Sequence, residues 1–340
     1  QRKGVFSLRS DRRYGQERAA CGRNYKGGCG RGRANSAKSD RMDKIAFVFS
    51  GQGDQYPGMG KSLAEKSPAA ARIFQMCDRL RPGTSQMCFE GSVMELQETK
   101  NTQPCLFAME LAAYEFLAEK GVQPDMAAGF SLGEVTAATA AGIFDYETGF
   151  QLVCLRGEFM QKEAEKFDTS MAAVLKLDEE RVGALCSQFS HIYPVNYNCP
   201  GQITVSGLAE EMKSFSKLVK ENGGRVLPLK VKGAFHSPFM KEAAKAFHAA
   251  LECTTIKPKQ FPLYSDLTAM PYAENVPELL SEQITGPVYW EKLIRNMIAD
   301  GADTFIEIGP GSTLCNMIRK IDAEVKVCRF EELIAEEGKC

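Results

Sequence analysis

A serine framed by two glycines is the feature of this sequence that most directly indicates chemistry. Gly129-Phe130-Ser131-Leu132-Gly133 follows a short apolar run and precedes an alanine-rich helical run, Val135 to Ala141. Strand, sharp turn and helix in this order are the context of a nucleophile elbow, which lifts the serine hydroxyl out of the turn. The backbone N–H of Leu132 then points at any oxyanion that forms there. The motif predicts Ser131 as a nucleophile, and the alternative is a Gly-Ser turn that only caps a helix.

A serine nucleophile needs a base, and the chain has three histidines, His191, His236 and His248. His191 lies in a polar connection, and His248 lies among alternating Ala and Lys residues at helical spacing, so we expect both to be exposed. His236 comes at the end of an apolar stretch and is followed by Ser237-Pro238, as in a turn at a strand end. We therefore predict that His236 is the general base for Ser131.

A second glycine-containing loop follows the first predicted strand, Lys44 to Phe49. Ser50-Gly51-Gln52-Gly53-Asp54-Gln55 contains no complete phosphate-binding motif, so a nucleotide site is weakly supported. Glycines also let a backbone N–H approach a reacting group, and acyl transfer through a serine needs two such donors. With Leu132 supplying one N–H, we predict that Gln52 supplies the other.

Four motifs occur in a fixed order along the chain. They are Gly51-Gln52-Gly53-x-Gln55, the 129–134 elbow, Gly233 to Met240, and Glu307-Ile308-Gly309-Pro310-Gly311. This set resembles malonyl-CoA:acyl-carrier-protein transacylases and the related acyltransferase domains of polyketide synthases, from Met42 to about Phe330. The resemblance implies a ping-pong transfer of malonyl from malonyl-CoA through a serine ester to the phosphopantetheine thiol of holo acyl carrier protein, for fatty-acid synthesis. It implies no metal and no tightly bound cofactor.

The resemblance also assigns substrate contacts. Arg156 matches an arginine that forms a bidentate pair with the free malonyl carboxylate, a task that suits a planar guanidinium. Leu132 and Phe235 agree with malonyl rather than methylmalonyl users. The other residues expected around the substrate are Gln103, Met160 and Asn198, although an asparagine at position 198 also fits a turn.

Further residues follow from the same resemblance. A backbone carbonyl near Tyr289 is expected to orient His236, and Arg319 and Lys320 match a basic spot that meets the acidic carrier protein. The family usually has His where this chain has Phe130, and usually Lys where it has Ser312. Phe130 adjoins the acyl pocket, so a strict preference for malonyl is implied less firmly.

The order of the predicted elements indicates an α/β fold. Residues 42–167 and 233–330 are expected to form an α/β-hydrolase-like parallel-sheet catalytic domain. Between them, residues 168–232 follow a β-α-β-β-α-β order, which predicts an inserted ferredoxin-like α+β subdomain. A cleft between the two parts is the expected substrate site.

The composition limits the other possibilities. The chain has 340 residues, 44% of them hydrophobic, with a formal net charge of −1, as in a soluble globular protein. Residues 1–41 carry twelve Lys or Arg and three Asp or Glu, so this tail is basic and the remainder is acidic, which argues against nucleic acid as the partner. Twelve cysteines without a C-x-x-C pair are typical of reduced thiols in a cytoplasmic protein, and no run is long enough for a membrane span. The resemblance to the transacylases implies a monomer.

The basic tail itself is predicted to be disordered, because it is poor in aliphatic residues and shows no helical or strand period. A transit peptide, a nucleic-acid-binding tail and an artefact of the gene start all remain open. The last is favoured, with the natural protein starting at Met42, because Met42-Asp43-Lys44 leads directly into a strand.

Other functions remain open at this point. A trans-acting malonyl transferase of a polyketide synthase would carry the same motifs. A serine thioesterase or hydrolase shares the elbow but normally has an acidic third member of its triad. A non-catalytic docking domain predicts degraded site residues, whereas every expected residue is present.

Overall fold

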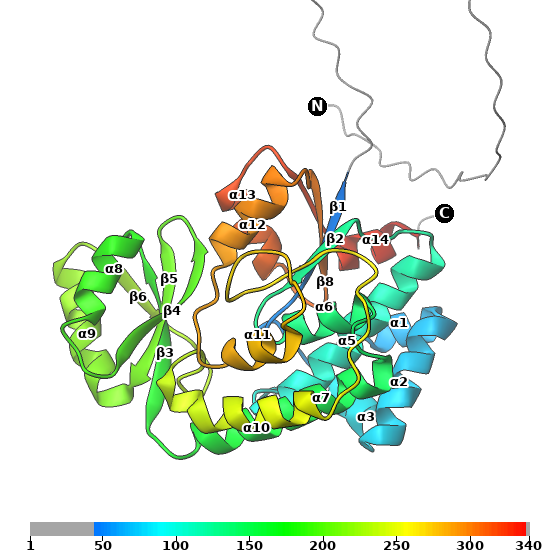
Figure 1. The fold of residues 1–340 in the computed structure, drawn as a ribbon, viewed down its shortest axis with the longest axis horizontal. Coiled ribbons are helices and arrows are strands. Elements are labelled where there is room, and N and C mark those ends of the chain that lie inside the picture. The colour runs from blue at the N-terminus through cyan, green and yellow to red at the C-terminus, as the bar shows by residue number, and fades with distance from the viewer. Residues whose placement is uncertain (1–43, 338–340) are drawn as a thin grey trace, which may run out of the picture. The chain divides into compact units, whose positions relative to one another are not determined.

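The computed structural model describes residues 44–337, which contain two β-sheets (Figure 1). The predictions for residues 1–41 lie outside the described residues. None of the described helices combines the length and apolarity needed to cross a membrane.

The first sheet has five parallel strands in the order β7-β2-β1-β8-β9. These strands are β1 (Ile45–Phe49), β2 (Met126–Gly129), β7 (Leu263–Tyr264), β8 (Thr304–Ile308) and β9 (Lys326–Arg329). Because all five run the same way, their carboxyl ends lie at one edge of the sheet, where ligand sites form in open α/β sheets. The elbow begins where β2 ends, so the sheet delivers Ser131 to this edge.

Helices cover both faces of this sheet, as the alternation along β1 requires. Phe47 and Phe49 are fully buried in a cluster with α5, whereas Ala46 and Val48 are buried in a second cluster with α12 and α13. The helices of this part are α1 (Lys61–Lys66), α2 (Pro68–Leu80), α3 (Thr84–Glu90), α4 (Val93–Leu96), α5 (Thr99–Glu119), α6 (Gly133–Ala140), α7 (Tyr146–Ala164), the 3₁₀ helix η1 (Pro238–Met240), α10 (Lys241–Glu252), α11 (Val276–Glu282), α12 (Trp290–Ala299), α13 (Thr313–Ile321) and α14 (Phe330–Glu337).

The second sheet is antiparallel, with the order β4-β5-β3-β6. Its elements are β3 (Thr169–Leu175), α8 (Glu179–Cys186), β4 (Ile192–Cys199), β5 (Gln202–Leu208), α9 (Ala209–Glu221) and β6 (Arg225–Pro228). They follow one another in the β-α-β-β-α-β order, and α8 and α9 bury a core of their own against the sheet (Figure 1). The predicted fold class, a parallel α/β part with a ferredoxin-like α+β part, is confirmed. The exact domain limits at 168 and 232 remain a prediction.

The segment between α11 and α12 ties the small sheet to the larger part. The Val288 N–H donates to the Val195 carbonyl at 2.8 Å, and the Tyr197 N–H donates to the Val288 carbonyl at 2.8 Å. Val288 is itself fully buried among residues of α12 and α13. Strand β4 is therefore fixed to the segment that connects α11 and α12.

Candidate active site

The elbow places Ser131 in a conformation that only a tightly packed turn maintains. Ser131 has a φ of 56°, in the left-handed region that non-glycine residues rarely adopt. A Cβ atom at Gly129 would lie 1.9 Å from the Gly133 carbonyl carbon, and one at Gly133 would lie 2.3 Å from the Phe49 carbonyl oxygen. Both glycines are required because the turn packs backbone against backbone. This contact projects the serine hydroxyl from the strand end.

His236 lies where the sequence predicts a base for this serine. Its Nε2 lies 2.7 Å from the Ser131 Oγ, and both side chains are buried. The His236 Nδ1 lies 2.8 Å from the backbone carbonyl oxygen of Gln283, a pure acceptor. The proton of a neutral imidazole must therefore be on Nδ1, which leaves Nε2 free to accept the serine proton.

The prediction that the carbonyl of Tyr289 orients this histidine is wrong. The Tyr289 carbonyl accepts the N–H of Leu293 as α12 begins, and the Tyr289 ring stacks on Tyr197 at a centroid distance of 5.1 Å. Gln283 follows the last residue of α11, so its carbonyl has no intrahelical donor and is available to His236. The two candidates are only six residues apart, and the sequence pattern around them does not show which carbonyl faces the imidazole.

Burial sets the protonation state of the histidine. Burial first, and then the nearby Arg156 guanidinium, lower the pKa of His236 to about 4, although the hydrogen bond to Gln283 opposes the shift. His236 is therefore neutral at pH 7 and can act as a base.

We predict that the His236 imidazole of the free enzyme stays neutral, with its proton on Nδ1, as the pH falls from 7 to about 5. The measurement is a titration of the ring nitrogens by NMR, which is tractable because the chain has only three histidines. A His236→Gln variant identifies the signal. A signal that charges near pH 6.5, the value for a free side chain, or a proton on Nε2, would contradict this geometry.

The two backbone N–H groups predicted to form an oxyanion site, those of Gln52 and Leu132, have no acceptor among the described residues, and their role remains a prediction. Gln52 lines the same cavity as Ser131, and its side-chain oxygen accepts a 2.8 Å hydrogen bond from Gln103 Nε2. Gln103 also lies 3.3 Å from the sulfur of Met160. Gln103 therefore acts by holding Gln52 rather than by lining the cavity.

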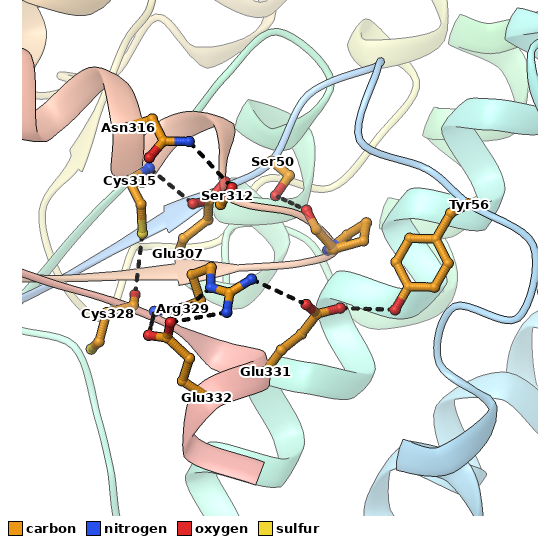
Figure 2. A network of polar contacts seen from close by, with 11 residues as sticks. Ser50, Tyr56, Glu307, Ser312, Cys315, Asn316, Cys328, Arg329, Glu331 and Glu332 are labelled. Carbon is orange, nitrogen blue, oxygen red and sulfur yellow. Dashed lines mark hydrogen bonds and ion pairs between the residues drawn. The ribbon is translucent and has the colours of Figure 1, made fainter. Parts of the chain in front are cut away.

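The loop that carries Gln52 is anchored at both ends (Figure 2). At one end, the Ser50 hydroxyl lies 3.4 Å from the Pro310 carbonyl oxygen, in the turn after β8. At the other end, the Tyr56 hydroxyl donates to a Glu331 carboxylate oxygen of α14 at 2.8 Å, and Arg329 lies on the far side of that carboxylate at 3.9 Å. These contacts hold the loop against the end of the parallel sheet.

Figure 2 also shows how the neighbouring helix α13 is fixed. The Glu307 carboxylate accepts the N–H groups of Leu314 and Cys315, at 3.0 and 2.9 Å, in the first turn of α13. A buried carboxylate on these otherwise unpaired donors fixes the start of the helix. Thr313 and Met317 of this helix line the same cavity as Ser131.

Arg156 lies fully buried in α7 beside the nucleophile. Its Nη2 donates to the Gln283 side-chain oxygen at 2.7 Å and lies 3.5 Å from the Ser131 Oγ. The Arg156 Nε and Nη1 are buried without a hydrogen-bond partner. Burial lowers the pKa of this guanidinium to about 10, so it remains charged at pH 7. Buried cations are normally paired, so these two donors indicate a site for an anion.

Gln283 makes hydrogen bonds with Arg156, His236 and Ser131, although the sequence did not predict it as a site residue. Its Oε1 accepts from Arg156, its backbone carbonyl accepts from His236, and its Nε2 donates to the Ser131 carbonyl at 2.7 Å. The same Nε2 lies within 3.1 Å of two buried carboxylates, those of Glu134 and Asp266.

One of these acids could have been found from the sequence. Asp266 follows strand β7 as Ser131 follows β2, and the two strands are parallel neighbours. Side chains that follow adjacent parallel strands meet at one edge of the sheet. The signal for Gln283 is absent, because a glutamine at a helix end is ordinary in any sequence.

A cavity of about 280 Å³ opens onto Ser131 between the two sheets. Three of the predicted substrate residues line it, Met160, Phe235 and Asn198. Asn198 belongs to β4 and not to a turn, and its Oδ1 is buried without a partner. The remaining lining residues are Gln52, Gly53, Asp54, Phe130, Met171, Ala173, Asn196, Gln202, Thr204, Leu229, Val231, His236, Thr313 and Met317.

Phe130 forms part of the cavity wall, and Lys320 contacts a residue that lines the cavity. The Phe130 ring packs edge-on against Trp290 at a centroid distance of 5.3 Å, which fixes one wall. The Lys320 Nζ, near the end of α13, lies 3.4 Å from the side-chain oxygen of Gln202, a lining residue. Arg319 and Lys320 are both exposed, and the Arg319 Nη2 donates to the Val327 carbonyl of β9 at 3.1 Å. Among residues 44–337, no group of three or more His, Cys, Asp or Glu side chains could hold a metal ion.

Comparisons with known proteins identify the family of the chain. Residues 46–335 match the model of the acyl transferase domain. The chain is 41% identical to the malonyl CoA-acyl carrier protein transacylase of Bacillus subtilis (strain 168), over 84% of this chain and 92% of that protein. It is 36% identical to the polyketide biosynthesis malonyl CoA-acyl carrier protein transacylase PksC of the same organism, over 82% of this chain and 98% of that protein.

The solved structures extend the similarity to three dimensions. The crystal structure of malonyl CoA-acyl carrier protein transacylase from Clostridium perfringens superposes with a TM-score of 0.83, at 31% identity, over 87% of this chain and 98% of that one. The family model spans residues 46–335, and the two relatives match this chain over nearly their whole length. These comparisons indicate the same family. With Ser131 and His236 in hydrogen-bond contact at the end of the parallel sheet, the chain belongs to the acyl transferase domain family.

Proposed function

We propose that this enzyme transfers malonyl from malonyl-CoA to the phosphopantetheine thiol of holo acyl carrier protein through an ester on Ser131. The observation that carries the proposal is the buried Arg156, whose Nε and Nη1 have no partner although its Nη2 reaches the nucleophile. Buried donors of a cation that no protein group uses fit an anionic group such as a carboxylate. Malonyl thioesters carry a free carboxylate, whereas acetyl thioesters do not.

The geometry supports each half of the reaction. His236 Nε2 accepts the Ser131 proton as Oγ attacks the thioester carbonyl, and the Gln52 and Leu132 N–H groups stabilise the oxyanion. The bond from carbon to sulfur breaks, the CoA thiolate takes the proton from His236, and malonyl remains on Ser131 with its carboxylate on Arg156. The carrier-protein thiol then gives its proton to His236 and attacks the ester carbonyl. The bond from carbon to the Ser131 Oγ breaks, and Oγ takes the proton from His236, which regenerates both residues. No step requires a metal or a tightly bound cofactor.

The group that orients His236 favours acyl transfer over hydrolysis. A neutral backbone carbonyl, that of Gln283, orients His236, where serine hydrolases normally use a carboxylate. A neutral orienter is sufficient for a thioester, because the thiolate leaves readily.

The carrier protein would approach along α13. This helix lines the cavity through Thr313 and Met317, and Arg319 and Lys320 are exposed in its last turn. Two exposed cations on this helix complement an acidic carrier protein, and steering of this kind raises the association rate. We place the enzyme in the cytoplasm, where its two substrates meet. There it would act as a monomer that supplies malonyl units for fatty-acid synthesis.

The test is intact mass spectrometry after brief mixing with malonyl-CoA. The expected result is one malonyl group on wild-type enzyme, located at Ser131 by peptide mapping and removed on addition of holo carrier protein. Rapid CoA release without an adduct would replace this proposal with a hydrolase. Neither an adduct nor CoA release would leave only a docking role.

A further inference from the structure

Two carboxyl groups lie buried beneath the nucleophile, and the transfer steps use neither of them. Glu134, in the first turn of α6, and Asp266, after β7, are both fully buried. The Asp266 Oδ2 accepts the Ser131 N–H at 2.6 Å. The Gln283 Nε2 lies 2.6 Å from the Glu134 Oε2 and 3.1 Å from the Asp266 Oδ2, so one amide bridges both acids.

The groups that face this pair supply hydrogen bonds but little charge. Tyr272 donates its hydroxyl to the Glu134 Oε1 at 2.6 Å, and the Asp266 N–H lies 3.1 Å from the same oxygen. The Asp266 Oδ1 is buried without a hydrogen-bond partner. Among the described residues no cation forms an ion pair with either acid. The positive charge of Arg156 acts on them across the Gln283 amide, and His236 is neutral.

The charges balance only when the pair holds a proton. Two ionised carboxylates beside one guanidinium would leave a net negative charge out of contact with water, which is unfavourable. Burial raises the pKa of Glu134 to about 7, and burial together with the neighbouring Glu134 raises the pKa of Asp266 well above its usual range. Near neutral pH the free enzyme therefore keeps one proton on the pair.

We propose that the Glu134–Asp266 pair takes up a second proton from solvent when the malonyl carboxylate binds at Arg156. This inference rests on the proposed function, because it requires an anionic acyl group at that guanidinium. The carboxylate cancels the positive charge that Arg156 exerts on the pair, and a proton from solvent restores the balance. The proton of the Ser131 hydroxyl is separate, since it passes through His236 to the CoA sulfur. The extra proton returns to solvent when the carrier protein removes the malonyl group.

The experiment counts protons as the enzyme is loaded. Wild-type enzyme is mixed with malonyl-CoA in weakly buffered solution near pH 7.5 with an indicator dye, and intact mass gives the loaded fraction. We expect uptake of roughly half to one proton per malonyl-Ser131, beyond the proton balance of CoA release. The double variant Glu134→Gln/Asp266→Asn removes both acids, while amide oxygens can still accept the Tyr272 hydroxyl and the Ser131 N–H. Without an acid to protonate, uptake in this variant should fall close to zero.

Asp54 is a further acid that titrates near neutral pH, so the proton count needs a control for it. Burial raises the pKa of Asp54 to about 7, and Asp54 lines the same cavity, with Thr313, Glu307 and Glu331 around it. An Asp54→Asn background should retain the difference in uptake that the double substitution causes. Should the double variant fail to fold, the infrared band of a protonated carboxyl group, measured in the Asp54→Asn background and expected to increase on loading, reports the pair with both acids in place.

The outcomes separate the two proposals. Loading accompanied by proton uptake that disappears in Glu134→Gln/Asp266→Asn supports the pair. Loading without uptake in wild type, or equal uptake in the double variant, overturns the pair and leaves the malonyl transferase intact. Absence of any malonyl adduct overturns the proposed function and this inference together.

Discussion

The Ser131→Ala variant is expected to lose malonyl transfer to the carrier protein by about 10⁴-fold or more. The substitution removes the oxygen that attacks the thioester and leaves Arg156 and the N–H groups of Gln52 and Leu132 in place. The variant should therefore still bind malonyl-CoA with little change in affinity, because the removed atom acts in the transition state. Initial rates of carrier-protein malonylation give the first quantity, and calorimetric titration with malonyl-CoA gives the second.

The fold of this variant provides the control. Ala at position 131 must adopt the same left-handed φ of 56°, and the contact of Gly129 with Gly133 that maintains the turn is unaffected. The midpoint of thermal unfolding should therefore stay close to that of wild type. Transfer within about tenfold of the wild-type rate would show that another residue carries the acyl group.

The parts of this site that the sequence could predict are those encoded locally. A strand, a glycine, a serine and a second glycine determine the elbow, because the close approach of backbone at 129 and 133 excludes other residues. The order of strands and helices from Thr169 to Pro228 was likewise sufficient to predict the antiparallel part. His236 could be identified by elimination because the chain has so few histidines.

The parts that the sequence could not predict depend on which segments meet in space. Gln283 and Tyr289 both flank helix ends near the site, and only the packing of α11 brings the Gln283 carbonyl to the imidazole. Asp266 and Glu134 are separated by more than 130 residues and meet through one amide of Gln283. A buried acid pair of this kind violates local expectations for carboxylates, and such violations concentrate at functional sites.

Arg156 should decide which acyl group the enzyme accepts. In Arg156→Ala, acylation of Ser131 by malonyl-CoA is expected to fall roughly 10³-fold, because two charge-assisted hydrogen bonds of about 1.5–3 kcal/mol each are lost. Acylation by acetyl-CoA should change far less, since acetyl has no carboxylate to bind there. Single-turnover rates of adduct formation with the two thioesters, followed by intact mass, give the ratio directly.

Arg156→Lys is the matched variant for this prediction. Lysine keeps the charge but lacks the planar fork, so it should recover part of the malonyl rate and remain well below wild type. Because Arg156 also donates to Gln283, which holds His236, a general disturbance of the site would lower both thioester rates equally. Equal losses with malonyl and acetyl thioesters would therefore make Arg156 a positioning residue. A loss confined to malonyl would mean that the Arg156 guanidinium, which has buried donors without a protein partner, binds the substrate carboxylate.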